Sequence, residues 1–141
     1  MTDKPAAVFH LAIPVHDLKE AEAFYGDLLG CARGRRSETW VDYNFYGHQL
    51  VTHLSRQAAP VATNQVEDEE VPVLHFGVLL SRADWEEAAT KLKAAGITFL
   101  IEPTMRHEGK PGEQRTMFFK DPSGNALEFK SMTNPDHVFA V

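Results

Sequence analysis

The sequence predicts an α+β fold built from two copies of one β-α-β-β-β module, together forming a single domain of 141 residues. Three observations predict this fold. The segment Val8–Ile13 recurs as Val73–Val78, an offset of 65 residues, with its apolar positions and one histidine coinciding. A helical pattern follows each copy, and three strand-like runs follow each helical pattern. Module one therefore spans about residues 8–54 and module two about residues 72–131.

The opening strand of each module carries a histidine on the face opposite its bulky side chains. Strand alternation places Leu11 and Ile13 on one face and His10 on the other. His75 has the matching position in the second copy. A single histidine in a strand is more often a structural residue than a ligand. Recurrence at the same place in two repeats favours a site.

One helix follows each opening strand. The first is predicted to begin after the capping residue Asp17 and to end at Gly30, and the second to begin after Ser81 and to end at Gly96. The apolar residues of both are spaced three and four apart, which predicts one buried stripe on each helix. They are Leu18, Ala21, Phe24, Tyr25, Leu28 and Leu29 in the first, and Trp85, Ala88, Ala89, Leu92 and Ala95 in the second.

Three strands are predicted after each helix, at 31–36, 39–46 and 48–54 and again at 97–102, 114–120 and 125–131. Turn residues separate the last two of each set, with Gly47 in the first module and the run Asp121-Pro122-Ser123-Gly124-Asn125 in the second. Residues 55–71 show little periodicity and are predicted to be a linker. Their acidic run, 67–70, is predicted to be a solvated surface.

Glu128 lies in the last predicted strand, where Leu127 and Phe129 point to the other face. If the two sheets curl into a shared cup, His10, His75 and Glu128 all point into it. Two imidazoles and one carboxylate suit Zn, Fe, Mn or Ni, and three protein ligands leave positions open for water, substrate or dioxygen. The sequence therefore predicts one divalent metal held by these three residues.

Composition excludes several classes of function. A net charge of −6 offers no basic patch for a phosphate backbone, so nucleic acid is not expected as a partner. No signal-like segment opens the chain and no run approaches the roughly 20 apolar residues that span a bilayer, which predicts a cytoplasmic protein with no membrane partner. Cys31 is the only cysteine, so a metal has to bind His, Asp or Glu.

The sequence resembles the vicinal oxygen chelate superfamily, which includes glyoxalase I, extradiol dioxygenases, bleomycin-resistance proteins and fosfomycin-resistance thiol transferases. The resemblance covers roughly residues 8–131. It depends on His10 before the helix that ends Phe24-Tyr25-Gly26-Asp27-Leu28-Leu29-Gly30, on His75 opening the second half, and on Phe118-Phe119-Lys120-Asp121-Pro122-Ser123-Gly124-Asn125-Ala126-Leu127-Glu128-Phe129. It implies paired βαβββ modules in a half-barrel around a metal, ligation by His10, His75 and Glu128, and a homodimer.

Departures from the family pattern narrow the chemistry. Alignment of Gly47 with Gly124 puts Val51 opposite Glu128, so the fourth protein ligand expected of glyoxalase I is missing. His53 shares the strand parity of Val51, and is a candidate catalytic acid or base, or a fourth ligand. A histidine near a strand end is also often an ordinary surface residue.

A three-ligand site is the arrangement of non-haem Fe(II) oxygenases, so Fe(II) is the favoured metal, with Mn, Ni or Zn as alternatives. We therefore expect a dioxygenase-type enzyme that acts on a small catechol-like, vicinal-oxygen substrate. A glyoxalase-type lyase or isomerase, and a non-catalytic protein that binds a small molecule in the same cup, are the alternatives. The loop 105–115, rich in glycine and charge, is a candidate lid over the site.

Overall fold

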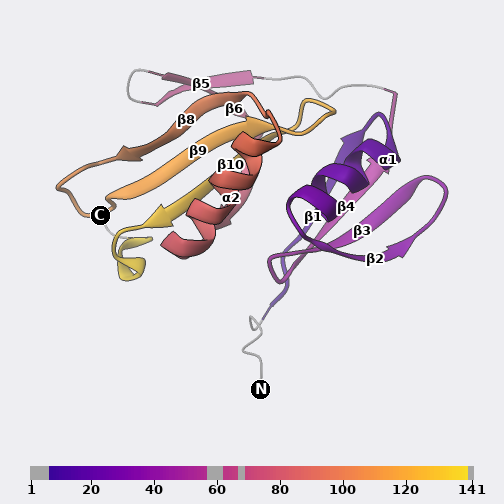
Figure 1. Cartoon of the computed structure of the whole chain (residues 1–141), viewed down its shortest axis with the longest axis horizontal. Helices are drawn as coiled ribbons and strands as arrows, with labels where there is room; N and C mark the ends of the chain where they lie inside the picture. The colour runs from indigo at the N-terminus through magenta and orange to yellow at the C-terminus, as the bar shows by residue number, and fades with distance from the viewer. Residues whose placement is uncertain (1–6, 57–61, 67–68, 140–141) are drawn as a thin grey trace. The chain divides into compact units, whose positions relative to one another are not determined.

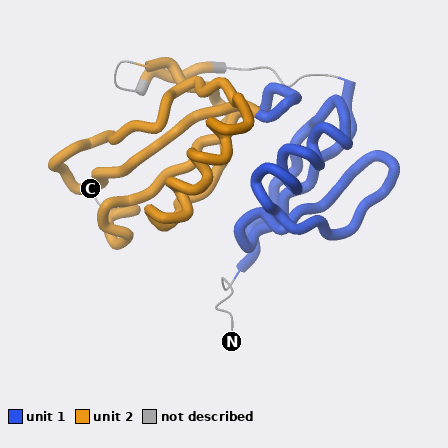
Figure 2. The backbone as a smooth tube through the Cα atoms, viewed as in Figure 1, with its two compact units in different colours: residues 1–60, 121–125 blue, residues 61–120, 126–141 orange. Residues whose placement is uncertain are grey.

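The computed structural model describes residues 7–56, 62–66 and 69–139, which form two compact units. The first unit comprises residues 1–60 with 121–125, and the second comprises residues 61–120 with 126–141 (Figure 2). Each unit contains one βαβββ module (Figure 1). The α+β class and the order of elements in both modules are therefore confirmed.

The first unit is an open four-stranded sheet with one helical segment. Its strands run in the order β1-β4-β3-β2, and β1 pairs with β4 in parallel. The remaining pairs are antiparallel. The elements are β1 (His10–Val15), α1 (Leu18–Ala21), η1 (Glu22–Leu28), β2 (Ala32–Arg36), β3 (Trp40–Phe45) and β4 (His48–Leu54).

The first helix differs from the expected regular α-helix. Asp17 caps it as predicted, because its side chain accepts a hydrogen bond from the Glu20 backbone N–H at 2.9 Å. From Glu22 onward, however, the helix widens into a π-helical segment, with the Leu29 N–H bonded to the Phe24 carbonyl. Apolar spacing still buries Ala21, Phe24 and Tyr25, since the wider turn keeps these side chains on the sheet side.

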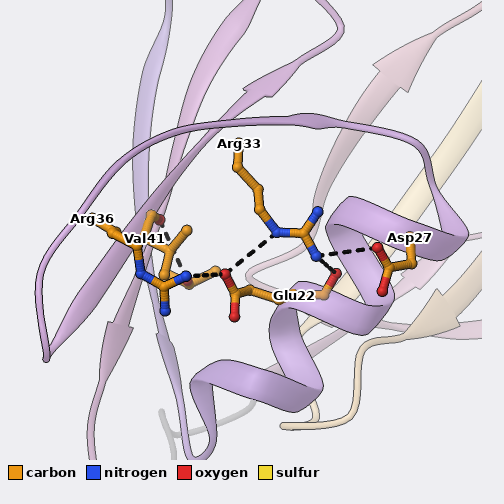
Figure 3. A network of polar contacts seen from close by, with 6 residues as sticks. Glu22, Asp27, Arg33, Arg36 and Val41 are labelled. Carbon is orange, nitrogen blue, oxygen red and sulfur yellow. Dashed lines mark hydrogen bonds and ion pairs between the residues drawn. The ribbon is translucent and has the colours of Figure 1, made fainter.

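A cluster of charged residues fastens η1 to the edge strand β2 (Figure 3). Arg33 donates to the Glu22 carbonyl O at 3.1 Å and to Asp27 Oδ1 at 3.1 Å, while Arg36 donates to Glu22 Oε1 at 2.7 Å. A Cβ on Gly26 would lie 2.5 Å from Arg33 Cζ. The Arg33 guanidinium therefore occupies the space that a side chain at position 26 would need, and it donates to the Glu22 carbonyl O of the helix. This contact lies along the irregular part of the helix.

The second unit repeats the arrangement. Its main sheet has the order β7-β10-β9-β8, with β7 parallel to β10, and Trp85 Nε1 donates to the Phe129 carbonyl at 2.9 Å, which fastens the helix to the sheet. Ser81 caps the helix as predicted. No helix among the described residues is long and apolar enough to cross a membrane. The elements are β5 (Ala62–Val66), β6 (Glu69–Val73), β7 (Phe76–Leu79), α2 (Arg82–Ala94), β8 (Phe99–Arg106), β9 (Gln114–Lys120), β10 (Ala126–Met132) and the 3-10 turn η2 (Pro135–His137).

The stretch predicted as a linker is partly structured. Strands β5 and β6 pair as an antiparallel hairpin, and Val71 packs in a buried cluster with Ile101 and Phe118. Sequence patterning missed the hairpin because its strands are short and polar. Glu69 and Glu70 of the acidic run are exposed, as expected, whereas residues 57–61 and 67–68 of the stretch lie outside the described residues.

Each main sheet has a helix-covered face and, opposite to it, a face that we call the helix-free face. Tyr43 packs its ring against Tyr25 of η1, with centroids 5.7 Å apart, so its strand neighbours Asp42 and Asn44 point to the helix-free face. Register extends this face across each sheet. It carries His10, Ala12, Asp42, Gln49, Val51 and His53 in the first unit, and Gly77, Thr116, Phe118, Glu128 and Lys130 in the second.

The turn before β10 belongs to the first unit. Asp121 is buried there, and its carboxylate accepts hydrogen bonds from the Tyr25 hydroxyl at 2.7 Å and from the Ser123 and Asn125 backbone N–H groups at 2.9 Å. Asn125 Nδ2 donates to the Pro14 carbonyl at 2.8 Å. This network fixes the turn from which the chain enters β10, three residues before Glu128.

Candidate metal centre

His75 and Glu128 lie next to each other in the second unit. Glu128 is on β10 and pairs with Gly77 of β7, while His75 lies directly before β7. His75 Nε2 is 3.5 Å from Glu128 Oε1. The side chains are 29% and 11% exposed, so both remain reachable from solvent. Two of the three predicted ligands are thus brought together.

His75 was expected within a strand, and the structure places it one residue earlier. The reason is that Val73 belongs to the hairpin strand β6, where it pairs with Ala62, so the chain turns at His75 before β7 begins. The turn has a chemical consequence. His75 Nδ1 lies 2.6 Å from the Pro72 carbonyl O, which can only accept a hydrogen bond. Nδ1 is therefore a hydrogen-bond donor, and Nε2 is the ring nitrogen directed toward Glu128.

Three further residues contact the pair. Thr116 is on β9, where it pairs with Lys130 of β10, and its hydroxyl donates a hydrogen bond to Glu128 Oε2. The Phe118 ring packs edge-on against the His75 ring, with centroids 4.8 Å apart. Lys130 Nζ is 3.9 Å from Glu128 Oε1 and places a positive charge beside the carboxylate. His75 is oriented through Nδ1 and Glu128 through Oε2. Histidines and carboxylates that bind a metal commonly have such a second hydrogen-bond partner.

The separation of the two donor atoms fits a shared metal. Ligands bound at about 2.1 Å with an angle between 90° and 109° lie roughly 3.0–3.4 Å apart. The observed 3.5 Å between His75 Nε2 and Glu128 Oε1 requires only a small adjustment to match. Imidazole nitrogen and carboxylate oxygen are also donors that Fe, Mn, Ni and Zn accept. These residues therefore fit a divalent ion.

His10 belongs to the first unit, on the helix-free face of its sheet. It is the first residue of β1, and its Nδ1 lies 2.8 Å from Oε1 of Gln49, its direct partner on β4. Across the described residues, no three His, Cys, Asp or Glu side chains are grouped as a metal site. Joint ligation by His10, His75 and Glu128 therefore stays a prediction.

Strand register supports the assignment of Val51 as the counterpart of Glu128. Ala12 pairs with Val51, and Gly77, the repeat equivalent of Ala12, pairs with Glu128. His53 follows two residues later on the same face. His53 lies four residues along β4 from Gln49, the strand partner of His10, so its Cα is roughly 13 Å from that of Gln49 at 3.3 Å per residue. A metal on Nε2 lies only about 6 Å from its histidine Cα, so these two histidines are too far apart to share one ion.

The predicted lid is shorter than expected, because β8 extends to Arg106 and leaves residues 107–113 as the loop. Glu113 ties this loop down: its carboxylate accepts from the Gly109 backbone N–H and from the Thr133 hydroxyl, both at 2.8 Å. These hydrogen bonds lower the pKa of Glu113 below its usual value, and the bond from the Gly109 N–H has the larger effect.

Sequence patterning missed Gln49, Pro72 and Thr116 as partners of the candidate ligands. Thr116 was within reach of sequence reasoning, since the tight turn at Asp121–Asn125 sets the register of β9 against β10. Pro72 was not, because a backbone carbonyl in an unrecognised hairpin leaves no side-chain signal.

Comparisons with known proteins agree with this architecture. The model of the Glyoxalase/Bleomycin resistance protein/Dioxygenase superfamily matches residues 7–129. A crystal structure of a glyoxalase/bleomycin resistance protein/dioxygenase from Alicyclobacillus acidocaldarius is 36% identical, with a TM-score of 0.80, over 98% of this chain and 100% of that one.

Two more distant structures share the fold. A lactoylglutathione lyase from Agrobacterium tumefaciens is 20% identical, with a TM-score of 0.65, over 99% of this chain and 100% of that one. The oxidase ChaP-H2 is 21% identical, with a TM-score of 0.67, over 92% of this chain and 96% of that one. With the family match covering most of the chain, this protein belongs to the glyoxalase/bleomycin resistance protein/dioxygenase superfamily.

Proposed function

We propose that this protein is a metal-dependent enzyme of the dioxygenase type, acting on a small substrate with two adjacent oxygens. His10, His75 and Glu128 would hold one divalent ion, Fe(II) in preference to Mn, Ni or Zn. The observation that supports it most is the pair His75 Nε2 and Glu128 Oε1, 3.5 Å apart and oriented by Pro72 and Thr116. A divalent metal there supplies a Lewis acid and open positions for a vicinal-oxygen compound.

The residues around the pair have separate roles in this proposal. The Pro72 carbonyl keeps the proton of His75 on Nδ1, so that Nε2 stays available. Thr116 holds Glu128 through Oε2 and leaves Oε1 toward His75. Phe118 forms an apolar wall beside the imidazole ring and excludes water from that side.

Proton transfer needs a further group, for which we propose His53. Its side chain is on the helix-free face of the first unit and is exposed, so it can exchange protons with solvent. Imidazole is the side chain that most often acts as a general acid or base in enzymes. His53→Gln should lower turnover while metal retention stays at the wild-type level.

Metal retention is the first test. Protein freed of metal and offered Fe(II), Mn(II), Ni(II) or Zn(II) should retain an ion with low-micromolar affinity or better, and His10→Ala and Glu128→Ala should lose it. His16→Ala is the matched control, because His16 is an exposed residue just before α1 whose side chain contacts Glu20 at 2.8 Å. Since imidazole binds a metal only when neutral, retention should weaken as pH falls and the ligand imidazoles take up protons.

Activity then separates the candidate reactions. Oxygen uptake with catechol by the Fe(II)-loaded protein would support the dioxygenase, while conversion of the methylglyoxal–glutathione hemithioacetal would support a lyase. The second outcome is the less expected, because Val51 occupies the position equivalent to Glu128. Failure of the wild type to retain any of the four metals would overturn the proposal and favour a binding protein.

A further inference from the structure

Three polar side chains form a chain across the helix-free face of the first sheet. His10 on β1 and Gln49 on β4 are direct partners in the parallel pair, and His10 Nδ1 lies 2.8 Å from Gln49 Oε1. On the other side, Gln49 Nε2 donates to Oδ2 of Asp42, on β3, at 3.4 Å. The chain therefore runs from an imidazole through an amide to a carboxylate.

The direction of these hydrogen bonds is set by the carboxylate. Ionised Asp42 can only accept, so Gln49 has to turn its NH₂ group toward Asp42. The amide oxygen of Gln49 then faces His10, and an oxygen acceptor there requires a proton on His10 Nδ1. Nε2 is left with its lone pair, which is the state that coordinates a metal.

The second unit reaches the same tautomer by another route. The residues equivalent to Gln49 and Asp42 are Ala126, two before Glu128 on β10, and Phe118, which pairs with Glu128. Neither can make the amide-to-carboxylate contact. There the acceptor for His75 Nδ1 is the Pro72 carbonyl at 2.6 Å. Two different local structures thus place an acceptor at Nδ1 of each histidine, which favours the tautomer with a free Nε2 in the neutral ring.

We propose that Gln49, oriented by Asp42, is a positioning residue that holds His10 in the tautomer with a free Nε2. This inference rests on the proposed function, in which His10 is a metal ligand. It adds that the first unit contains a dedicated side-chain pair for this purpose, although neither member binds the ion. A partner of this kind commonly contributes a factor of 10–100 to metal affinity.

The tautomer can be measured without any metal. In the full-length, metal-free, ¹⁵N-labelled protein at pH 8, the ring nitrogens of His10, assigned by their loss in His10→Ala, should show a protonated Nδ1 and an unprotonated Nε2. Gln49→Leu should shift His10 toward the Nε2–H form and weaken Zn(II) affinity about tenfold or more in a chelator competition. Gln114→Leu, the same change on β9 of the second unit, should alter neither quantity.

A double variant tests the mechanism itself. In Gln49→Glu with Asp42→Asn, the new carboxylate at position 49 still accepts from Nδ1 and the new amide at position 42 can donate to it, so the wild-type tautomer should return. An Nε2–H form of His10 in the wild type, or a Gln49→Leu variant unchanged in tautomer and affinity, would overturn the inference while leaving the triad intact. Retention of metal by His10→Ala would instead overturn the proposed function, whatever the tautomer.

Discussion

Tyr25→Phe should destabilise the protein more than the loss of one hydroxyl ordinarily does. The Tyr25 hydroxyl is fully buried and donates at 2.7 Å to Asp121 Oδ2, and Asp121 is itself only 5% exposed. In the variant, this oxygen keeps only the donor from Asn125 Nδ2 at 2.9 Å. A buried carboxylate oxygen thus loses one of its two hydrogen-bond donors.

The expected cost follows from the charge on the acceptor. Hydrogen bonds to charged groups contribute about 1.5–3 kcal/mol, so we expect a loss of about 2 kcal/mol. An unfolding entropy of about 2.1 cal/mol/K per residue amounts to about 0.3 kcal/mol/K for this chain, and the melting temperature should fall by about 7 °C. Thermal unfolding followed by circular dichroism, with urea unfolding as a second measurement, gives both quantities.

Tyr46→Phe is the matched control, because Tyr46 is 36% exposed and its loss of a hydroxyl should stay within about 0.5 kcal/mol. Asp121→Asn should cost more than Tyr25→Phe, about 4 kcal/mol, since an amide NH₂ would face donors on one side of the former carboxylate. If Tyr25→Phe cost no more than the control, the buried network would not hold this turn as argued.

Four other predictions test separate parts of the molecule. Thr116→Val removes the hydroxyl that orients Glu128 and should weaken metal affinity about 10-fold to 100-fold in a chelator competition, with unchanged affinity as the contrary result. Gly77→Ala should disrupt the second sheet and lower the melting temperature by 10 °C or more, since the new Cβ would lie 1.6 Å from the Glu128 carbonyl O; a normal melt would contradict the pairing of β7 with β10. Burial raises the pKa of Cys31 from 9.0 to about 11, so iodoacetamide should label this thiol slowly in the native protein at pH 8 and rapidly in urea, and equal labelling rates would refute its burial. Because the folded protein favours the neutral thiol, the contribution of Cys31 to stability is present below pH 9 and is lost as pH rises toward 11. We also expect a homodimer by sedimentation at micromolar concentration, and if the site is shared between chains, refolding His10→Ala together with Glu128→Ala should restore metal binding that neither variant has alone; a monomer would refute the dimer.

Much of the fold was predictable because each local signal agreed with its neighbours. Asp17 and Ser81 cap the helices that were expected after them, and the glycines Gly30 and Gly96, at the two helix ends, have φ of 78° and 75°. Alignment of the turn glycines Gly47 and Gly124 also predicted that Val51 would be the counterpart of Glu128, and the register of both parallel pairs agrees. Periodicity and turn chemistry suffice where side chains alternate between core and solvent.

The remaining features depend on contacts between segments far apart in the sequence. The π-helical segment is accompanied by Arg33 donating to the Glu22 carbonyl, a contact that helical periodicity cannot reveal. The hairpin β5–β6 depends on Val71 meeting Ile101 and Phe118 on another strand. His75 then falls outside β7 because the hairpin extends to Val73. In each case a tertiary contact overrides the local pattern.

The turn Asp121–Asn125 connects the stability of the fold to the candidate site. It belongs to the first unit through Tyr25 and Pro14, whereas β10 and Glu128 belong to the second, so the chain passes between the units on both sides of this turn. Under the proposed function His10 and Glu128 bind the same ion, so metal retention depends on residues of both units. Tyr25→Phe should therefore lower metal retention as well as stability, while Thr116→Val should lower retention alone.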